Sequence, residues 1–238
     1  LMPPWALEGG PGRLLDRLAD PAERERIRAD LGRPWGELDN PLLSIGFGRI
    51  TVVGFTSEEN LGFEGMSIAD IARRRGREPD ECALDLILEE DGEPSVIQHH
   101  IDERDMEVAL AWPWAMVGSD GLPLKSAKLH PRHYGTFPRV LGRYVRERKT
   151  LSLEAAVRKM TSLPADRFRL PGRGRVVAGA VADLVVFTPD EVEDAATFDD
   201  PRRHPKGIDM VVVNGRVAAR DGACENHPGT LVRARDQA

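Results

Sequence analysis

The stretch Ala115-Met116-Val117-Gly118-Ser119-Asp120-Gly121 decides the expected fold, because a short apolar run in it ends abruptly at an acid among small residues. The run 115–117 predicts a buried strand, and the flanking glycines allow a sharp turn where a ligand can approach the backbone. In a (β/α)8 barrel, the carboxyl ends of the strands carry the active site. Asp120 is then a candidate site residue, and the alternative is an ordinary turn or helix cap.

A second informative stretch follows ten residues later and gathers imidazole, guanidinium and phenol groups. It runs His130-Pro131-Arg132-His133-Tyr134-Gly135-Thr136-Phe137-Pro138-Arg139-Val140-Leu141. Its glycine and proline content predicts a loop rather than a helix or strand. Loops with such side chains commonly bind ligands, so we expect binding residues here.

Strand and helix patterns alternate over the first 170 residues. Two helices are predicted within 14–31, the second of which begins at Pro21 after Asp20. Another helix is predicted within 67–75, from a capping box formed by Ser67 and Asp70 to its end at Gly76. Further helices are predicted from Pro79 onward and over 102–111. Strands are predicted within 44–55 and 95–100 and at 115–118. This alternation indicates a parallel α/β architecture.

The sequence pattern changes from Gly172 onward, where short apolar runs are separated by predicted turns. The runs are 175–177, 182–187, 210–213 and 217–219. Asn214-Gly215, between the last two, is a strong signal for a type I′ hairpin. We therefore predict two domains, an α/β part over 1–170 and a small β segment over 171–238.

Composition and charge restrict the class of partner. The chain is 41% hydrophobic and 30% charged, which is typical of a soluble globular protein. A formal charge of -6 argues against a nucleic-acid partner, and no apolar run approaches the roughly 20 residues of a membrane span. We expect a small-molecule ligand, no nucleic acid and no membrane, while the oligomeric state stays open.

Cysteines and histidines show no metal-ligand spacing. Cys82 and Cys224 form no paired motif, and Cys82 lies in an apolar helical pattern that predicts a buried free thiol. His99-His100 is interpreted as a polar strand end without a metal. His204 and His227 are expected in solvated loops, and no His-x-His or His-x-Asp pair occurs in the 238 residues.

The two stretches together resemble the N-acyl-D-amino-acid deacylases (D-aminoacylases) of the amidohydrolase superfamily. The resemblance rests on three motifs, Gly-Ser-Asp-Gly at 118–121, His-Pro-Arg at 130–132 and Tyr-Gly-Thr-Phe-Pro-Arg-Val-Leu at 134–141. It also extends to residues 3–10, 151–165 and 179–187. It implies an α/β fold: the C-terminal portion of a (β/α)8 TIM-type barrel over 1–170, followed by a small β-sandwich segment over 171–238. The stretch 124–129 departs from the more polar pattern of the family.

The resemblance also implies an activity, the hydrolysis of the amide bond of N-acyl-D-amino acids by a zinc-activated water. Asp120, adjacent to the metal, would take the water's proton and pass it to the departing nitrogen. Arg132 would bind the substrate carboxylate through two parallel hydrogen bonds. The alternative is that Arg132 stacks on Tyr134 or pairs with a local acid. Tyr134, His130 and Met116 would complete the substrate site.

No residue of this chain is assigned as a certain metal ligand. In the resembled family the metal-binding residues lie early in longer chains, so we expect the zinc ligands mostly outside these 238 residues. The chain is therefore expected to be the C-terminal part of a larger cytoplasmic enzyme and to be inactive alone. Two alternatives remain: a cyclic-amide hydrolase of the dihydroorotase or hydantoinase type, and a non-catalytic fragment or interaction module.

Overall fold

The computed structural model describes residues 1–122 and 128–233, which form two compact units of a mixed α/β protein. The first unit comprises residues 1–101 with Lys128 and Leu129, and the second comprises 102–122 and 130–233. Most of the stretch 124–129, where the sequence departs from the resembled family, lies outside the described residues. None of the described helices has the length and apolar character needed to cross a membrane.

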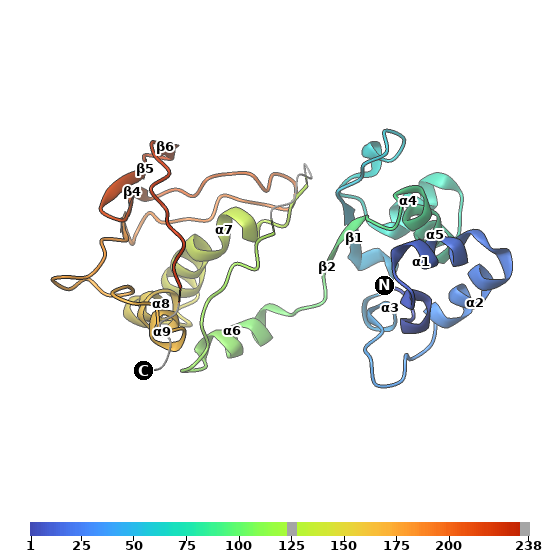
Figure 1. Ribbon diagram of the computed structural model, residues 1–238, viewed down its shortest axis with the longest axis horizontal. Coiled ribbons are helices and arrows are strands. Elements are labelled where there is room, and N and C mark those ends of the chain that lie inside the picture. Colours follow the sequence, from blue (N-terminus) through green and yellow to red (C-terminus); the bar gives the residue numbers. More distant parts are fainter. Residues whose placement is uncertain (123–127, 234–238) are drawn as a thin grey trace. The chain divides into compact units, whose positions relative to one another are not determined.

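The first unit gathers helices around one pair of short strands (Figure 1). Its elements are η1 (Pro4–Leu7), α1 (Pro11–Ala19), α2 (Pro21–Leu31), α3 (Pro41–Ile45), η2 (Phe47–Arg49), β1 (Ile50–Val53), η3 (Leu61–Phe63), α4 (Ile68–Arg75), α5 (Pro79–Glu89) and β2 (Ser95–Gln98). The predicted strand region 44–55 is thus a strand only in its second half.

Local capping chemistry explains where these helices begin and end. The Asp20 side chain accepts hydrogen bonds from the backbone N–H groups of Ala22 and Glu23, both at 2.9 Å, and so caps α2. Ser67 Oγ accepts from the Asp70 N–H at 3.1 Å at the start of α4. Gly76 ends α4 with a φ of 63°, a left-handed conformation that costs glycine little. The helix starts predicted at these positions are confirmed.

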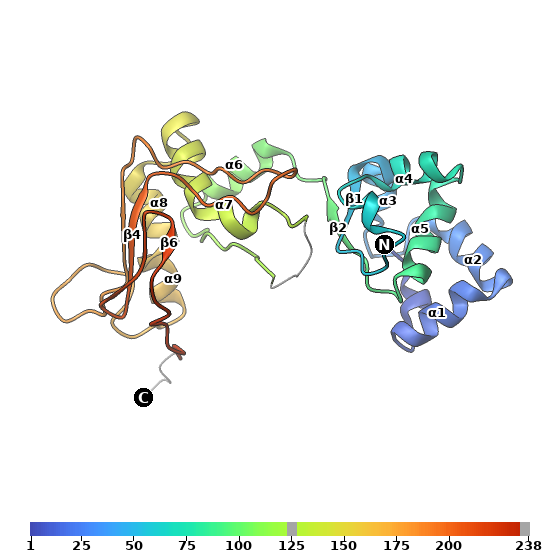
Figure 2. The same ribbon diagram turned by 90° about the horizontal axis from the view of Figure 1, so that it is seen from above.

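The core of the first unit lies where α5 packs beside α1, α2 and α4 (Figure 2). Ile27, Ile50, Ile71 and Leu84 are each 0% exposed, and each buried side chain of this size contributes about 1.5–3 kcal/mol through removal from water. Cys82 is buried in the same cluster as a free thiol, as predicted, and burial raises its pKa.

The strands of the first unit pair antiparallel, with Ile50 opposite Gln98 and Val53 opposite Ser95. The prediction of a parallel arrangement is therefore wrong for the described strands. The connection from β1 to β2 contains η3, α4 and α5, whereas a parallel pair is usually connected through a single crossover helix.

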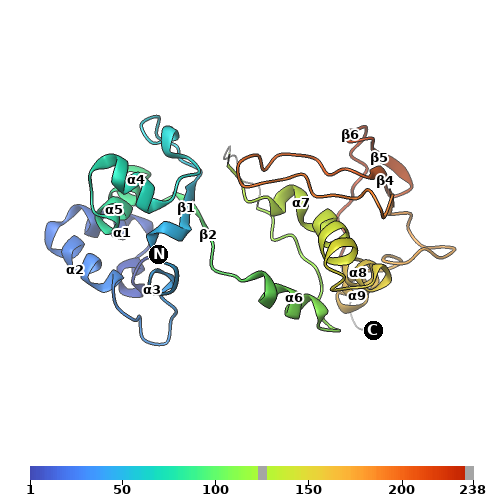
Figure 3. The same ribbon diagram turned by 180° about the vertical axis from the view of Figure 1, so that it is seen from behind.

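The second unit combines a helical layer with an antiparallel sheet. Its elements are α6 (Glu103–Ala111), α7 (Arg132–Arg139), the π-helix η4 (Val140–Glu147), α8 (Leu153–Met160), α9 (Ser162–Arg167), β3 (Leu184–Phe187), β4 (Ile208–Val213), β5 (Arg216–Arg220) and β6 (Ala223–Cys224). Figure 3 shows α7 continuing into η4, which runs toward α8. Val140, Leu141, Ala156 and Val192 form its buried core cluster.

The loop predicted over 130–141 is wrong, because α7 and the start of η4 occupy most of it. Gly135 serves close packing rather than a turn: a Cβ there would lie 2.0 Å from Asp194 Oδ1. Pro138 lies inside α7 and is buried, so packing outweighs the hydrogen bond that proline cannot donate. Local propensity therefore gives way to tertiary contacts in this segment.

The strand predicted at 115–118 is also absent, and this segment has no regular secondary structure. Its polar backbone groups find partners on α8 instead of on a neighbouring strand. The Val117 N–H donates to the Lys159 carbonyl at 3.2 Å, and Lys159 Nζ donates to the Ala115 carbonyl at 3.2 Å. Since buried backbone groups need partners of some kind, these bonds replace those of a strand ladder.

The sheet of the second unit has the order β3-β4-β5-β6, with every neighbouring pair antiparallel. Asn214 and Gly215 connect β4 to β5 with φ angles of 49° and 75°, which confirms the predicted hairpin. Asp183 accepts the Asn214 N–H at 2.8 Å and so ties β3 to this turn. The run 175–177 is not a strand.

Candidate active site

The segment that leads to Asp120 is anchored to α8 by a buried lysine. Lys159 is 4% exposed, and its Nζ donates to the carbonyls of Trp112 and Ala115. Burial lowers the pKa of this ammonium group. Together with the bond from the Val117 N–H to the Lys159 carbonyl, these contacts fix the chain up to three residues before Asp120.

Asp120 itself occupies an unusual backbone conformation. Its φ is 48°, in the left-handed region that residues with a Cβ rarely adopt. The next residue, Gly121, donates its N–H to Ser119 Oγ at 3.3 Å. The carboxylate is 76% exposed, and its Oδ2 lies 3.0 Å from Nη2 of Arg132.

Arg132 is the first residue of α7, which places its guanidinium beside Asp120. Its backbone N–H donates to His130 Nδ1 at 3.0 Å. The side chain is 35% exposed, yet its Nε is buried and has no hydrogen-bond partner among the described residues. Arg132 thus retains donor capacity beyond its ion pair.

The remaining predicted site residues lie in different surroundings. His130 packs its ring edge against Phe198 with the centroids 5.2 Å apart. Tyr134 lies on α7 with Arg132, and its ring meets that of His204 with the centroids 5.6 Å apart. His204 is exposed in a loop, as predicted. Met116 is 36% exposed on the segment before Asp120. The described contacts therefore join Asp120, Arg132 and His130, and they place Tyr134 in a separate ring contact.

Sequence reasoning missed two residues that shape this site. Lys159 could have been noticed as a lysine on the same helical face as the buried Ala156, three residues earlier. His133 holds the backbone that follows Asp120, because its Nε2 accepts the Leu122 N–H or donates to the Leu122 carbonyl. No local pattern identifies that role, because the partner lies eleven residues away in the sequence.

Metal-ligand geometry is not present in the part of the chain that the structure describes, where no group of three or more His, Cys, Asp or Glu side chains could hold an ion. His99 instead lies 3.0 Å from the Thr51 hydroxyl through its Nε2. An apolar cavity of about 200 Å³ lies in the core of the first unit, lined by residues such as Leu14, Leu31 and Leu86, and it includes none of the predicted site residues.

Comparisons with known proteins bear on this site. The model of the amidohydrolase family matches residues 57–219, a range that contains both Asp120 and Arg132. An N-acyl-D-glutamate deacylase of Alcaligenes xylosoxydans xylosoxydans is 44% identical over 169 residues, covering 71% of this chain and 33% of the relative. A D-aminoacylase of the same organism is 42% identical over 175 residues, covering 73% of this chain and 35% of the relative. The chain thus spans about a third of the length of these curated relatives.

Solved structures show the same similarity. The N-acyl-D-glutamate deacylase of Bordetella bronchiseptica, complexed with zinc and a phosphonate inhibitor, aligns with a TM-score of 0.72 and 39% identity over 82% of this chain and 39% of that chain. A crystal structure of a D-aminoacylase aligns with a TM-score of 0.70 and 38% identity, covering 78% of this chain and 38% of that chain.

Proposed function

We propose a deacylase function from this premise: the chain belongs to the amidohydrolase family. In the proposal, the chain forms part of an enzyme that hydrolyses the amide bond of N-acyl-D-amino acids to a carboxylate and a free D-amino acid. Relatives named for N-acyl-D-glutamate deacylase and D-aminoacylase activity support this substrate class. The observation that carries the proposal is the 3.0 Å pairing of Asp120 with Arg132.

Asp120 and Arg132 supply complementary chemistry for such a reaction. Amide hydrolysis needs a base for the attacking water and an acid for the departing nitrogen, and one exposed carboxylate serves as both in turn. A guanidinium offers two parallel donors to the carboxylate of an N-acyl amino acid. His130, Tyr134 and Met116 stay candidates for shaping the substrate site.

Zinc is the metal that we propose for the whole enzyme, because one solved relative is complexed with it. The described residues do not fit a complete zinc site, since they contain no suitable group of three or more ligands. We therefore propose that the zinc ligands lie mainly outside the described residues of this chain. Asp120 then lies adjacent to the metal in the assembled site.

The domain organisation belongs to the same proposal. We propose that residues 1–170 form part of a (β/α)8 barrel and that 171–238 form a β-sandwich segment. The alignments with solved amidohydrolase relatives over about four-fifths of the chain support this assignment. The compact units of the structure divide instead between residues 101 and 102, so the boundary at 170 stays a prediction.

The test of the proposed function is Asp120→Asn, which keeps the shape of the side chain and removes its basicity. In the complete enzyme that contains this chain, we expect kcat for N-acetyl-D-amino acids to fall by about 10² or more while bound zinc is retained. The matched control is Asp221→Asn. Asp221 shares the φ of 48°, is exposed and is also followed by glycine.

Three results would contradict the assignment. Near-normal turnover by Asp120→Asn would remove Asp120 from the chemistry. Turnover of cyclic ureides instead of N-acyl-D-amino acids by the complete enzyme would favour the dihydroorotase or hydantoinase type. Absence of both activities and of zinc uptake in the complete protein would favour a non-catalytic module.

A further inference from the structure

The backbone of Asp120 is held in a conformation that its own side chain does not secure. A φ of 48° in a residue other than glycine costs about 1–2 kcal/mol and persists only where the surroundings impose it. The carboxylate is 76% exposed, so packing of the side chain contributes little. The bonds that hold Asp120 must therefore come from the residues on either side of it.

His133 provides such bonds on the carboxyl-terminal side. Its Nε2 lies 3.0 Å from the Leu122 nitrogen and 2.8 Å from the Leu122 carbonyl, and its Nδ1 lies 2.8 Å from the His130 carbonyl. The ring also lies close to Gly121, since a Cβ placed there would be 3.7 Å from His133 Cδ2. One imidazole thus hydrogen-bonds the second residue after Asp120 and lies near the first.

His133 bonds Leu122 in either neutral tautomer. With the proton on Nδ1, that nitrogen donates to the His130 carbonyl, and Nε2 accepts the Leu122 N–H. With the proton on Nε2, that nitrogen donates to the Leu122 carbonyl. In both forms the ring connects α7 to the backbone after Asp120.

The position of His133 in the sequence makes this connection relevant to Asp120 and Arg132. His133 directly follows Arg132 on α7, and Leu122 lies two residues after Asp120. The ring consequently couples the segment that carries the carboxylate to the helix that carries the guanidinium. On the other side, the Val117 N–H is fixed to Lys159, so the chain is anchored both before and after Asp120.

We propose that His133 is a positioning residue that holds Asp120 in its left-handed conformation and so keeps the carboxylate paired with Arg132. Its effect on catalysis rests on the proposed deacylase function, whereas its effect on the backbone does not. His133 needs no contact with substrate in this role. Its removal is expected to lower kcat through misplacement of Asp120 and to leave KM nearly unchanged.

Two substitutions distinguish the contacts of the two ring nitrogens of His133. In His133→Gln the side-chain amide reaches the place of Nε2 and can still accept from the Leu122 N–H. In His133→Asn the amide reaches only the place of Nδ1, so the bond to His130 can persist while the bond to Leu122 is lost. Both variants keep a polar side chain of similar character on α7, and the glutamine variant serves as the matched control.

The backbone is measured first, by NMR on the full chain. A strong NOE between the amide and α protons of Asp120 marks a positive φ. We expect this NOE in the unaltered protein and in His133→Gln, and we expect it to weaken in His133→Asn. An undiminished NOE in His133→Asn would overturn the proposal. If His133→Asn does not fold, a weak NOE in the unaltered protein or in His133→Gln would overturn it equally.

Kinetics with an N-acetyl-D-amino acid provide the second readout. We expect His133→Asn to lower kcat about tenfold or more with KM changed by less than about threefold, and His133→Gln to stay within about threefold of the unaltered protein. Unchanged kcat in His133→Asn would overturn the catalytic part. These kinetics are measured in the complete enzyme that contains this chain. If that enzyme shows no turnover but the NOE responds as expected, the deacylase function fails and the positioning role stands.

Discussion

Asp120 and Arg132 form an ion pair that is more useful for function than for stability. Their side chains are 76% and 35% exposed, and ion pairs with this exposure contribute about 0–1 kcal/mol to folding because solvent screens them. Substitution of either residue should therefore leave the fold intact. Kinetic effects at these positions can then be assigned to the site itself.

Arg132→Ala is expected to raise KM for N-acyl-D-amino acids by about 10- to 100-fold, because charge-assisted hydrogen bonds to a carboxylate are worth about 1.5–3 kcal/mol. The measurement compares each substrate with its carboxamide analogue, which lacks the carboxylate. We expect the variant to discriminate little between the two compounds. If the loss is equal for both compounds, Arg132 acts only through its pair with Asp120.

At the scale of elements, the end of α5 shows how a single acid organises a loop. Glu90 is 2% exposed and accepts hydrogen bonds from the backbone and hydroxyl groups of Thr56 and Ser57 and from the Asn60 amide. Burial alone would raise the pKa of Glu90, but these bonds, from Ser57 above all, outweigh it and hold the pKa at about 2. The loop 56–60 is thus fixed to α5 by a charged group.

This lowered pKa predicts how stability depends on pH. The ordinary pKa of a glutamate is about 4.5, so the contribution of Glu90 is complete above that value and is lost as the pH falls toward about 2. A shift of this size corresponds to roughly 3 kcal/mol at neutral pH. We expect Glu90→Gln to lose most of this stabilisation at neutral pH. The difference in unfolding free energy between the variant and the unaltered protein should shrink as the pH falls from 4.5 to 2.

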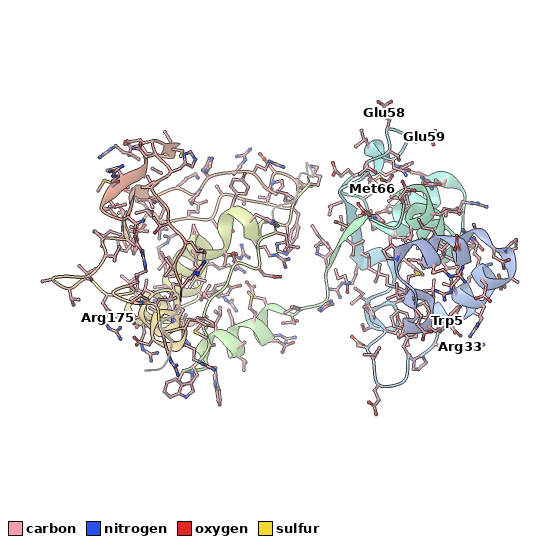
Figure 4. All side chains as sticks on the ribbon, in the orientation of Figure 1. Trp5, Arg33, Glu58, Glu59, Met66 and Arg175 are labelled. Carbon is pink, nitrogen blue, oxygen red and sulfur yellow. The ribbon has the colours of Figure 1, made fainter. Side chains whose placement is uncertain are left out.

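Chemical denaturation at several pH values measures this difference, and Glu59→Gln is the matched control. Glu59 is an exposed acid of the same loop, and Figure 4 shows Glu58 and Glu59 pointing outward. A Glu90→Gln variant that follows the same pH dependence as the unaltered protein would exclude Glu90 as the source of the effect.

At the scale of the whole molecule, each compact unit buries its own apolar cluster. The first unit encloses a large cluster around Ile27, Ile71 and Leu84, and the second encloses a smaller cluster around Leu141 and Ala156. Separate cores commonly correspond to separate cooperative units of unfolding. The stability of one unit can therefore be changed through its own core.

Leu84→Ala is expected to destabilise the first unit by about 2–5 kcal/mol, because the fully buried side chain leaves a cavity. Hydrogen exchange should show faster opening of amides in residues 1–101, with little change in residues 130–233. Val185→Ala, at a position 54% exposed in β3, is the control and should change little. Equal loss of protection in both units would show that they unfold as one.

The sequence by itself determined the features that depend on neighbours along the chain. The caps at Asp20 and Ser67, the end of α4 at Gly76 and the hairpin at Asn214-Gly215 each involve contacts within a few residues, so their patterns are visible locally. Asp120 and Arg132 were also predicted as site residues from their motifs, and the structure places them in contact.

Only the tertiary structure decided the conformation around that site. The segment before Asp120 satisfies its backbone groups on Lys159, more than forty residues later, and so it forms no strand. Helix α7 forms despite Gly135 and Pro138, because close packing against Asp194 and burial outweigh their weak propensity for helix. In both places the deciding partner is distant in the sequence, and a local pattern carries no information about a distant partner.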